Sequence, residues 1–314
     1  MDRKIVKKYF KENAIAWLSD AYFEGDYTYP VGRHRARIVI KIIKNQFGLK
    51  KINLIDLGCG RGDLCIAEAH LGNYVTGIDQ SEKMISMANK SKILLSEDVS
   101  SKIKFICGDF EKVNLQNNTY DVATSLGVIG YLPDDDYLFT IAKKILKPNG
   151  IFIVSCRNRL FNMFPTSKYT KMEIQEESAL KLVEEIEELC QPIPNKKVEK
   201  FIDSLRKTTN KISRDFNQKK DISSMNKNSK SESLFKTTIE ARQHTPKQLS
   251  LTAQKYGFKT IQYYSIHPHL FIPKLNKLLP PKIFNQLSGC LENFEDLPIS
   301  LIWSSVFIAV FETK

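Results

Sequence analysis

The sequence predicts an α/β fold, with a mostly parallel sheet covered by helices on both faces, a helical cap before it and a helical insertion within it. From Lys51, short β-rich runs alternate with amphipathic stretches of helix length, which is typical of βαβ units. The runs INLIDLG, YVTGID, IKFICGD, YDVATSLG and GIFIVSC are nearly continuous in apolar residues. Such runs are expected for strands that are buried on both faces.

Segments on either side of these runs predict how the chain is organised. We expect a helical cap in residues 1–50, an α/β core in residues 51–157, a helical and basic insertion in residues 158–242 that is a candidate lid, and completion of the core in residues 243–314. A helix is expected after Thr245, which suits an N-cap, with Pro246 at its first position and Gly257 at its end. Two apolar strands, KTIQYYSI and a run from Trp303 to Phe311, follow.

Charge is distributed unevenly along the chain. The net charge is +12, from 47 Lys and Arg against 35 Asp and Glu. Between Lys196 and Lys236, twelve basic residues stand against five acidic ones, a local excess of +7. Because such basic runs are more often solvated surface than binding grooves, we expect a surface segment here rather than a nucleic-acid groove.

No segment of the sequence has the pattern of a membrane span or a signal peptide. The first residues, MDRKIVKKYFKEN, lack an apolar run. The most apolar stretch, Ile299 to Phe311, is too short to span a bilayer and is interrupted by Ser304 and Ser305. We therefore expect a cytoplasmic protein without a membrane span.

The run LIDLGCGRGDL, from Leu54 to Leu64, places an apolar strand directly before a glycine-rich turn and a helix. Gly58, Gly60 and Gly62 follow a G-x-G-x-G spacing, whereas the dinucleotide fingerprint is G-x-G-x-x-G. Asp56 precedes the first glycine by two residues. A carboxylate there disfavours a pyrophosphate and suits a ligand with an ammonium group and no phosphate, such as S-adenosylmethionine.

Two more strand ends carry acidic residues that suit the same ligand. Asp79 ends the strand of TGIDQSEKMI, where it can accept hydrogen bonds from both ribose hydroxyls. Asp109 ends the strand of FICGDF, where it can accept from an adenine amino group while Phe110 packs beside the ring. Each acid alone fits helix capping equally well. Because ligands of open α/β sheets bind at the carboxyl ends of the strands, we expect these residues to converge on one crevice.

Taken together, LIDLGCGRGDL, GIDQSEKMI, CGDF, YDVATSLGVIGYL and LKPNGIFIVS resemble the successive motifs of class I S-adenosylmethionine-dependent methyltransferases. The resemblance covers about Asn53 to Ser155. It implies a Rossmann-like, seven-stranded sheet that ends in an antiparallel hairpin, with S-adenosyl-L-methionine as cofactor. It also implies roles at the cofactor for Gly58, Gly60 and Gly62 (methionine part), Asp79 (ribose), Asp109 and Phe110 (adenine), and Leu126 (backbone contact to the methionine amine).

Other motifs narrow the acceptor. The fourth strand continues as SLGVIGYL rather than Asn-Pro-Pro-Tyr or Asp-Pro-Pro-Tyr, and no Pro-Cys occurs there. This disfavours amino-group methylation of nucleic acids or protein glutamine, and a cytosine-C5 mechanism. The runs RQHTPKQLSLTAQKYGF, YYSIHP and RNRLFNMF resemble a bacterial branch of small-molecule and surface-glycan methyltransferases.

A hydroxyl acceptor has to lose a proton, and histidine suits that task near neutral pH. Of the five histidines we rank His267 first and His244 second as the base, although for any single histidine a structural role is the more common one. Among Arg33, Arg35 and Arg37, we select Arg37 to pair with the cofactor carboxylate, because its place before Asp56 resembles the arginine of quinone-type methyltransferases. The alternative is a solvated basic face.

The sequence therefore predicts methyl transfer to an oxygen of a small molecule. The expected acceptor is a sugar or a phosphorylated or nucleotide-linked intermediate of surface polysaccharide or secondary metabolite biosynthesis, with no metal and no nucleic acid involved. Two alternatives stay open. One is an RNA methyltransferase that grips RNA through Lys196 to Lys236, where only Phe201, Phe216 and Phe235 are interleaved with the charges. The other is a non-catalytic, cofactor-binding subunit of an enzyme complex.

Overall fold

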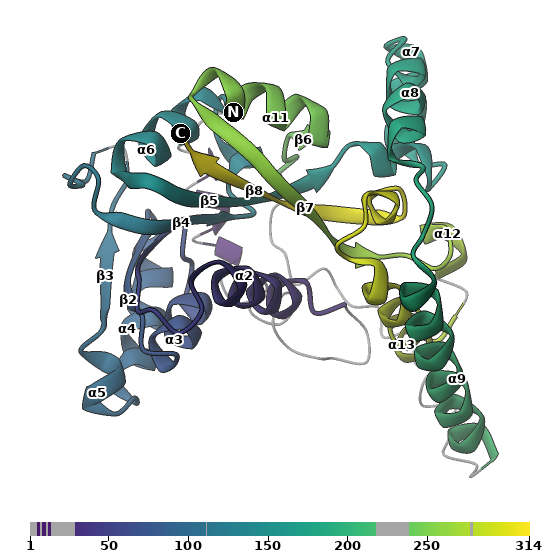
Figure 1. Cartoon of the computed structure of the whole chain (residues 1–314), viewed down its shortest axis with the longest axis horizontal. Helices are drawn as coiled ribbons and strands as arrows, with labels where there is room; N and C mark the ends of the chain where they lie inside the picture. Colours follow the sequence, from purple (N-terminus) through teal and green to yellow (C-terminus); the bar gives the residue numbers. More distant parts are fainter. Residues whose placement is uncertain are drawn as a thin grey trace.

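The fold is built around one eight-stranded sheet (Figure 1). The computed structural model describes residues 29–110, 112–217, 239–276 and 279–314, together with parts of residues 5–13. The strand order is β3-β2-β1-β4-β5-β8-β7, and the short β6 pairs with β5 off this path. The strands are β1 (Asn53–Leu57), β2 (Tyr74–Asp79), β3 (Ile103–Cys107), β4 (Tyr120–Leu126), β5 (Leu146–Asn158), β6 (Gln243–His244), β7 (Phe258–Pro268) and β8 (Ser304–Thr313).

Strand pairing confirms the predicted sheet and adds one strand to it. Strands β1 to β6 pair in parallel, and β8 runs antiparallel to both β5 and β7. The terminal hairpin is therefore present as expected. The strand count of seven was too low, because Gln243 and His244 form two further pairs with Arg157 and Asn158 of β5. A two-residue strand is too short to give a periodic pattern in the sequence.

One face of the sheet is covered by the helices that precede and follow β1. They are α2 (Val31–Phe47), α3 (Asp63–His70), α4 (Glu82–Ile93) and the short α5 (Glu97–Ser100). Helix α2 buries Ile38, Val39, Ile42 and Ile43 in this layer. The spacing of these four residues places them on one stripe of the helix. Helix α2 thus packs on the sheet as part of its core.

The opposite face is covered by α6 (Asp136–Ile145) and α11 (Pro246–Lys255). Helix α11 begins as predicted: Pro246 is its first residue, and the Thr245 side chain accepts a hydrogen bond from the backbone amide of Gln248. The Gln248 side chain accepts one from the amide of Thr245 in return, which completes a capping box. These interactions fix the helix start directly after His244.

The remaining elements lie beyond β5 along one side of the molecule (Figure 1). They comprise η2 (Leu160–Met163), α7 (Lys168–Gln175), α8 (Ala179–Leu189), α9 (Asn195–Asn217), α12 (Pro273–Asn276), α13 (Pro281–Gly289), η3 (Cys290–Phe294) and η4 (Pro298–Leu301). Helices α7, α8 and α9 fall in the predicted insertion, and residues 218–238 of that insertion lie outside the described residues. The domain boundaries and the lid remain predictions. Among the described helices, none has the length and apolar character needed to cross a bilayer.

Candidate active site

The carboxyl ends of β1, β2 and β4 meet at one edge of the sheet, and the glycine turn lies there. Strand β1 pairs with β2 on one side and with β4 on the other. The backbone amides of Gly58 and Cys59 both donate to the carbonyl of Ile78, at 2.8 and 2.9 Å. The turn is therefore fixed to the end of β2, one residue before Asp79.

The three glycines of the turn differ in what surrounds them. A Cβ at Gly58 would lie 2.3 Å from a methyl group of Val128, and one at Gly62 would lie 2.4 Å from the ring of Phe105. A Cβ at Gly60 would meet nothing within 4 Å. Gly58 and Gly62 are thus required by packing within the protein, whereas Gly60 leaves open space beside the backbone.

Asp79 joins the glycine turn to the start of α4. Its carboxylate accepts hydrogen bonds from the backbone amides of Gly60 (2.9 Å) and Ser81 (2.8 Å). Burial raises the pKa of Asp79, and these two hydrogen bonds partly oppose that rise. The side chain of Ser81, not that of Asp79, caps α4 by accepting from the amide of Met84. Asp79 is therefore not the N-cap of this helix.

Asp56 is buried, whereas Asp79 is partly exposed. Its carboxylate accepts a hydrogen bond of 2.7 Å from the Thr124 hydroxyl on β4. Burial and, to a smaller extent, the charge of Asp79 raise the pKa of Asp56, which reaches about 7 although the hydrogen bond from Thr124 lowers it. A buried carboxyl group with this pKa is ionised most easily beside a positive charge.

The end of β3 brings Asp109 and Phe110 together with a tyrosine of α6. The Tyr137 hydroxyl donates to the Asp109 carboxylate at 2.9 Å. The rings of Phe110 and Tyr137 have centroids 5.4 Å apart and are tilted by 35°. Phe110 is buried. Two aromatic rings and one carboxylate therefore stand together where the sequence places an adenine site.

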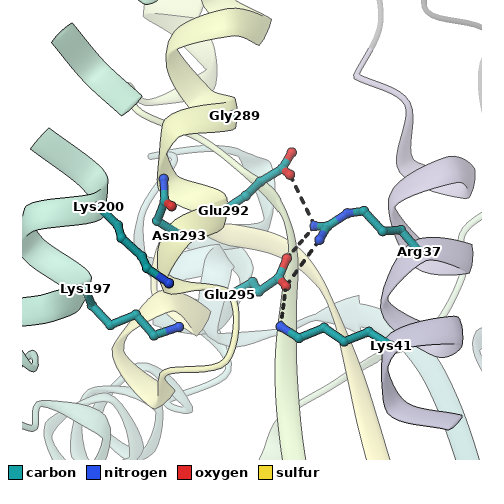
Figure 2. Close-up of a pocket in the computed structure, with 8 residues that line it drawn as sticks. All are labelled: Arg37, Lys41, Lys197, Lys200, Gly289, Glu292, Asn293 and Glu295. Carbon is teal, nitrogen blue, oxygen red and sulfur yellow. Dashed lines mark hydrogen bonds and ion pairs between the residues drawn. The ribbon is translucent and has the colours of Figure 1, made fainter. Parts of the chain in front are cut away.

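The arginines of α2 divide between two locations. A Cβ at Gly127, directly after Leu126 of β4, would lie 2.9 Å from Nη1 of Arg35. Arg37 instead donates to the carboxylates of Glu295 and Glu292 (Figure 2). The structure thus brings Arg35 to the end of β4 and directs Arg37 toward η3. Residues two apart point to opposite sides of a helix, so the two arginines cannot both face the end of β4. The pairing of Arg37 with the cofactor carboxylate stays a prediction, and Arg35 is the rival that this geometry favours.

Around Glu295, charged side chains from α2 and the η3 region form what we call the Glu295 network. Nε2 of His34 lies 3.1 Å from the Glu295 carboxylate, and Lys41 donates to it at 3.0 Å. Although burial raises the pKa of Glu295, hydrogen bonds from His34 and Arg37 lower it to about 2. His34, Glu292 and Glu295 hold three potential metal ligands within 4.8 Å of one another. Because Arg37 and Lys41 already neutralise both carboxylates, we assign this network to fastening α2 onto η3.

His244 forms a pair with Asp135 near the end of β4. Its Nε2 lies 2.9 and 3.1 Å from the two carboxylate oxygens of Asp135. Although burial raises the pKa of Asp135, the hydrogen bond from His244 and the charge of Arg242 lower it below its usual value. Nδ1 of His244 is buried and has no hydrogen-bond partner among the described residues. A carboxylate accepts a hydrogen bond from Nε2–H, so in the neutral ring Nδ1 carries no proton and can accept one.

Strand pairing places His244 beyond the end of β4. Leu126, the last residue of β4, pairs with Ser155 of β5. His244 pairs with Asn158, three residues further along β5. The backbone amide of Arg242 also donates to the carbonyl of Gly130 at 2.8 Å, in η1 (Ile129–Tyr131). Strand β6 thus lies at the carboxyl edge of the sheet, beside the loop that follows β4.

His267, at the end of β7, has different surroundings. Its Nδ1 lies 2.9 Å from the Ser305 hydroxyl, and its ring stacks on Tyr29 with centroids 4.8 Å apart. Burial lowers the pKa of His267 well below its usual value, and the nearby His269 lowers it further. His267 also has a backbone φ of +57°. The neutral ring is thus held between a hydroxyl and an aromatic face, and within the described part of the chain no hydrogen bond joins it to His244.

Two further residues, Tyr131 and Arg157, lie near the end of β4. Tyr131, in η1, is buried, and burial raises its pKa, while the charges of Arg157 and Arg35 act in the opposite direction. Arg157 is exposed and lies on β5 beside Gln243. Two guanidinium groups are thus close enough to act on one buried phenol. The sequence singled out neither residue, because Tyr131 lies in the apolar run GVIGYL and Arg157 is one of two arginines in the run CRNRL.

With this geometry in place, comparison with known proteins identifies the family. A family model described as "Methyltransferase domain" matches residues 49–256, which is more than half of the 314 residues. The chain belongs to the S-adenosylmethionine-dependent methyltransferases. Its cofactor is S-adenosyl-L-methionine, as the resemblance of the glycine turn implied.

Curated relatives of this methyltransferase match only part of their own length. Ubiquinone biosynthesis O-methyltransferase from Coxiella burnetii is 30% identical over 125 residues, which cover 40% of this chain and 52% of that protein. The enzyme of the same name from Vibrio atlanticus is 28% identical over 167 residues, or 52% and 66% of the two chains. This methyltransferase thus spans between half and two thirds of these relatives.

Solved structures share the fold of this methyltransferase over its whole length. Magnesium protoporphyrin IX methyltransferase from Synechocystis PCC 6803, with bound SAH, superposes with a TM-score of 0.56 at 15% identity and covers 100% of both chains. The [4+2]-cyclase SpnF superposes with a TM-score of 0.53 at 13% identity, over 98% of this chain and 95% of its own. At such low identity, these structures confirm the Rossmann-like fold.

Proposed function

We propose that this chain transfers the methyl group of S-adenosylmethionine to a hydroxyl oxygen of a small, negatively charged molecule. The observation that carries the proposal is the His244–Asp135 pair at the carboxyl edge of the sheet, with Nδ1 of His244 unbonded among the described residues. A hydroxyl must be deprotonated before or during attack on the methyl carbon, and an oriented neutral imidazole suits that task. The O-methyltransferase relatives point to the same acceptor atom.

The residues of the glycine turn and the strand ends fit the cofactor. We assign the methionine part to the turn formed by Gly58, Gly60 and Gly62, in which Gly60 leaves open space beside its backbone and the other two shape the turn. Asp79 is assigned to the ribose hydroxyls, since a carboxylate can accept from both. Asp56 is assigned to the positively charged end of the cofactor, because a cation nearby favours ionisation of a carboxyl with a pKa of about 7.

The rest of the cofactor site is assigned to residues around β3 and β4. Asp109 would accept from the adenine amino group, and Phe110 would pack against the ring. Leu126 would contribute a backbone contact to the amino group of the methionine part. Arg35, rather than Arg37, would bind its carboxylate, because the Arg35 guanidinium lies beside Gly127.

The acceptor is assigned a negative charge because Arg157 is exposed on β5 and pairs with Gln243, the residue before His244. If Arg35 binds the cofactor carboxylate, Arg157 is available for a second anion, and it is exposed. A phosphate or a carboxylate on the acceptor would suit a guanidinium there, with the Tyr131 hydroxyl as a further donor. A phosphorylated or nucleotide-linked sugar meets this description and remains our finer proposal.

The cofactor supplies an electrophilic methyl group that is transferred by in-line displacement. The protein's part is to align the acceptor oxygen with that group and to remove its proton. In our assignment, Nδ1 of His244 takes the proton, and Asp135 stabilises the imidazolium that results. Arg157 holds the acceptor by its anionic group. His267, with its depressed pKa, then lines the site as a neutral ring and positions Tyr29.

Incubation with methyl-labelled S-adenosylmethionine and a fractionated pool of small metabolites tests this proposal. We expect label to enter an anionic fraction, and a ¹³C-methyl spectrum of the product to show a methoxy group. Label in an N-methyl or C-methyl group, or in neutral compounds alone, would overturn the assignment of the acceptor. Cofactor binding without any turnover would instead support the alternative function, a non-catalytic cofactor-binding subunit. A [4+2]-cyclase shares this fold, so the fold alone does not exclude that alternative.

A further inference from the structure

The helices between β5 and β6 form an extended arm along one side of the molecule (Figure 1). Helices α7 and α8 lie at one end of this side, and α9 continues toward the other end after a five-residue linker, residues 190–194. We call residues 168–189 the acidic half of the arm and residues 195–217 the basic half. At 1.5 Å per residue, the 23 residues of α9 extend over about 35 Å.

The two halves carry opposite charge. The acidic half has seven Glu against three Lys, a net charge of −4. The basic half has seven Lys or Arg against three Asp or Glu, a net charge of +4. Glu173 and Glu185 are buried, and they bond Arg159 and the backbone amide of Lys247. The other five acids of the acidic half are exposed.

Each half also leaves apolar side chains in solvent. In the acidic half, Leu180 is 69% exposed and Ile174 is 61% exposed. In the basic half, Ile202 and Phe216 are 46% and 45% exposed. Leu180 and Val183 belong to the stripe that the pattern of α8 would place against a core, yet α8 buries Leu182 and Glu185 instead. The outer face of the arm thus combines apolar side chains with one sign of charge at each end.

We propose that the arm pairs antiparallel with the arm of a second copy of this chain, so that each acidic half lies on the basic half of the partner. Two-fold symmetry makes such a contact self-complementary, because the same two halves meet twice. Within one copy the acidic and basic halves follow one another along the arm, so they cannot lie side by side and neutralise each other. Opposite charges would set the register of the two arms, and the exposed apolar side chains would supply the contact area.

The inner face of the arm is held by the fold and stays in place in this arrangement. Phe201 of α9 packs on Phe294 of η3 with ring centroids 5.0 Å apart, and Lys197 donates to Asp296 at 2.5 Å. Lys200, beside Lys197, faces a pocket of about 340 Å³ that Asn293 also lines (Figure 2). Lys207 and Lys211 are exposed and have no ion pair among the described residues, whereas Arg206 pairs with Asp203 within α9.

Charge reversal in the two halves tests the proposal by sedimentation velocity on the full chain. We expect a dimer at low salt, and a dissociation constant at least tenfold larger at high salt. The reason is screening, which shortens the Debye length from about 30 Å at 0.01 M to about 3 Å at 1 M. Lys207→Glu/Lys211→Glu and, separately, Glu184→Lys/Glu187→Lys should each be monomeric. An equimolar mixture of the two variants should form heterodimers, since both contacts are then complementary again.

The matched control reverses two exposed lysines on α4, away from the arm, as Lys83→Glu/Lys90→Glu, and it should dimerise like the unaltered chain. Monomers of the unaltered chain at low salt would overturn the proposal. So would variants that dimerise normally, or a mixture that stays monomeric. A monomeric chain whose basic half binds RNA or anionic vesicles would assign that half to a different partner and would equally overturn it.

Discussion

The guanidinium of Arg35 lies against Gly127, so close that a Cβ at this glycine would come within 2.9 Å of Nη1. Through this contact, the first helix that covers the sheet reaches the end of β4, where our assignment places the methionine part of the cofactor. Arg37, only two residues later, is bound to Glu292 and Glu295 on the other side of the helix. The two arginines therefore have separable roles.

Exchange of each arginine for glutamine should separate binding from stability. Arg35→Gln should weaken S-adenosylmethionine binding by about 10- to 100-fold, because a charge-assisted hydrogen bond contributes about 1.5 to 3 kcal/mol. Arg37→Gln should lower the melting temperature and leave affinity nearly unchanged, since it removes a partner from the buried Glu295 carboxylate. Calorimetric titration and thermal unfolding measure the two effects. The reverse pattern would return the cofactor role to Arg37.

Alanine at two glycines of the turn should likewise have opposite effects. Gly58→Ala forces Val128 to move and should lower the free energy of unfolding by about 2 to 4 kcal/mol, from overpacking and a backbone φ of +85°. Gly60→Ala meets no protein atom and should cost about 1 kcal/mol for its φ of +55°. It should nevertheless weaken cofactor binding at least tenfold. Equal affinity in Gly60→Ala and the unaltered chain would remove Gly60 from the cofactor site.

The pKa of Asp56, raised to about 7, predicts how stability changes with pH. The folded state binds this proton more tightly than the unfolded state, so the stabilisation is complete below the ordinary pKa of about 3.9 and is lost as pH rises through 7. Between pH 5 and pH 8, the stability of the unaltered chain relative to Asp56→Asn should fall by about 2 to 3 kcal/mol. Urea unfolding at several pH values measures this difference.

Glu295→Gln provides the control with the opposite sign. The pKa of Glu295 is lowered to about 2, so its contribution is present above its ordinary pKa of about 4.3 and is lost only as pH falls toward 2. The difference between the unaltered chain and Glu295→Gln should therefore be constant between pH 5 and pH 8. A constant difference for Asp56→Asn as well would contradict the burial-driven rise in its pKa.

Removal of the proposed base should slow turnover without loss of cofactor binding. His244→Gln should lower kcat by about 10² to 10⁴, as expected for loss of general base catalysis, and should remove the acidic limb of the pH–rate profile. Asp135→Asn should also lower kcat, through its effect on the orientation of His244. His267→Gln should change kcat much less. If His267→Gln has a lower kcat than His244→Gln, His267 is the base, which is the order in which the sequence alone ranked the two histidines.

The sequence by itself determined the α/β fold of this protein and the identity of its cofactor. Short sequence runs identify three features: the turn after β1, the acids at the ends of β2 and β3, and the terminal hairpin. Parallel strands bring their carboxyl ends to one edge of the sheet regardless of how the helices pack on its faces. The Thr245 cap of α11 was equally readable, because its hydrogen bonds join residues three apart.

The tertiary structure decided what depends on contacts between distant segments. His244 and Asp135 are 109 residues apart, and only the pairing of β6 with β5 brings them together. The choice between Arg35 and Arg37 depends on the rotation at which α2 packs on the sheet, which a helical pattern does not specify. The same holds for α8, whose apolar stripe indicated burial. Packing instead turned Leu182 and Glu185 inward and left Leu180 in solvent.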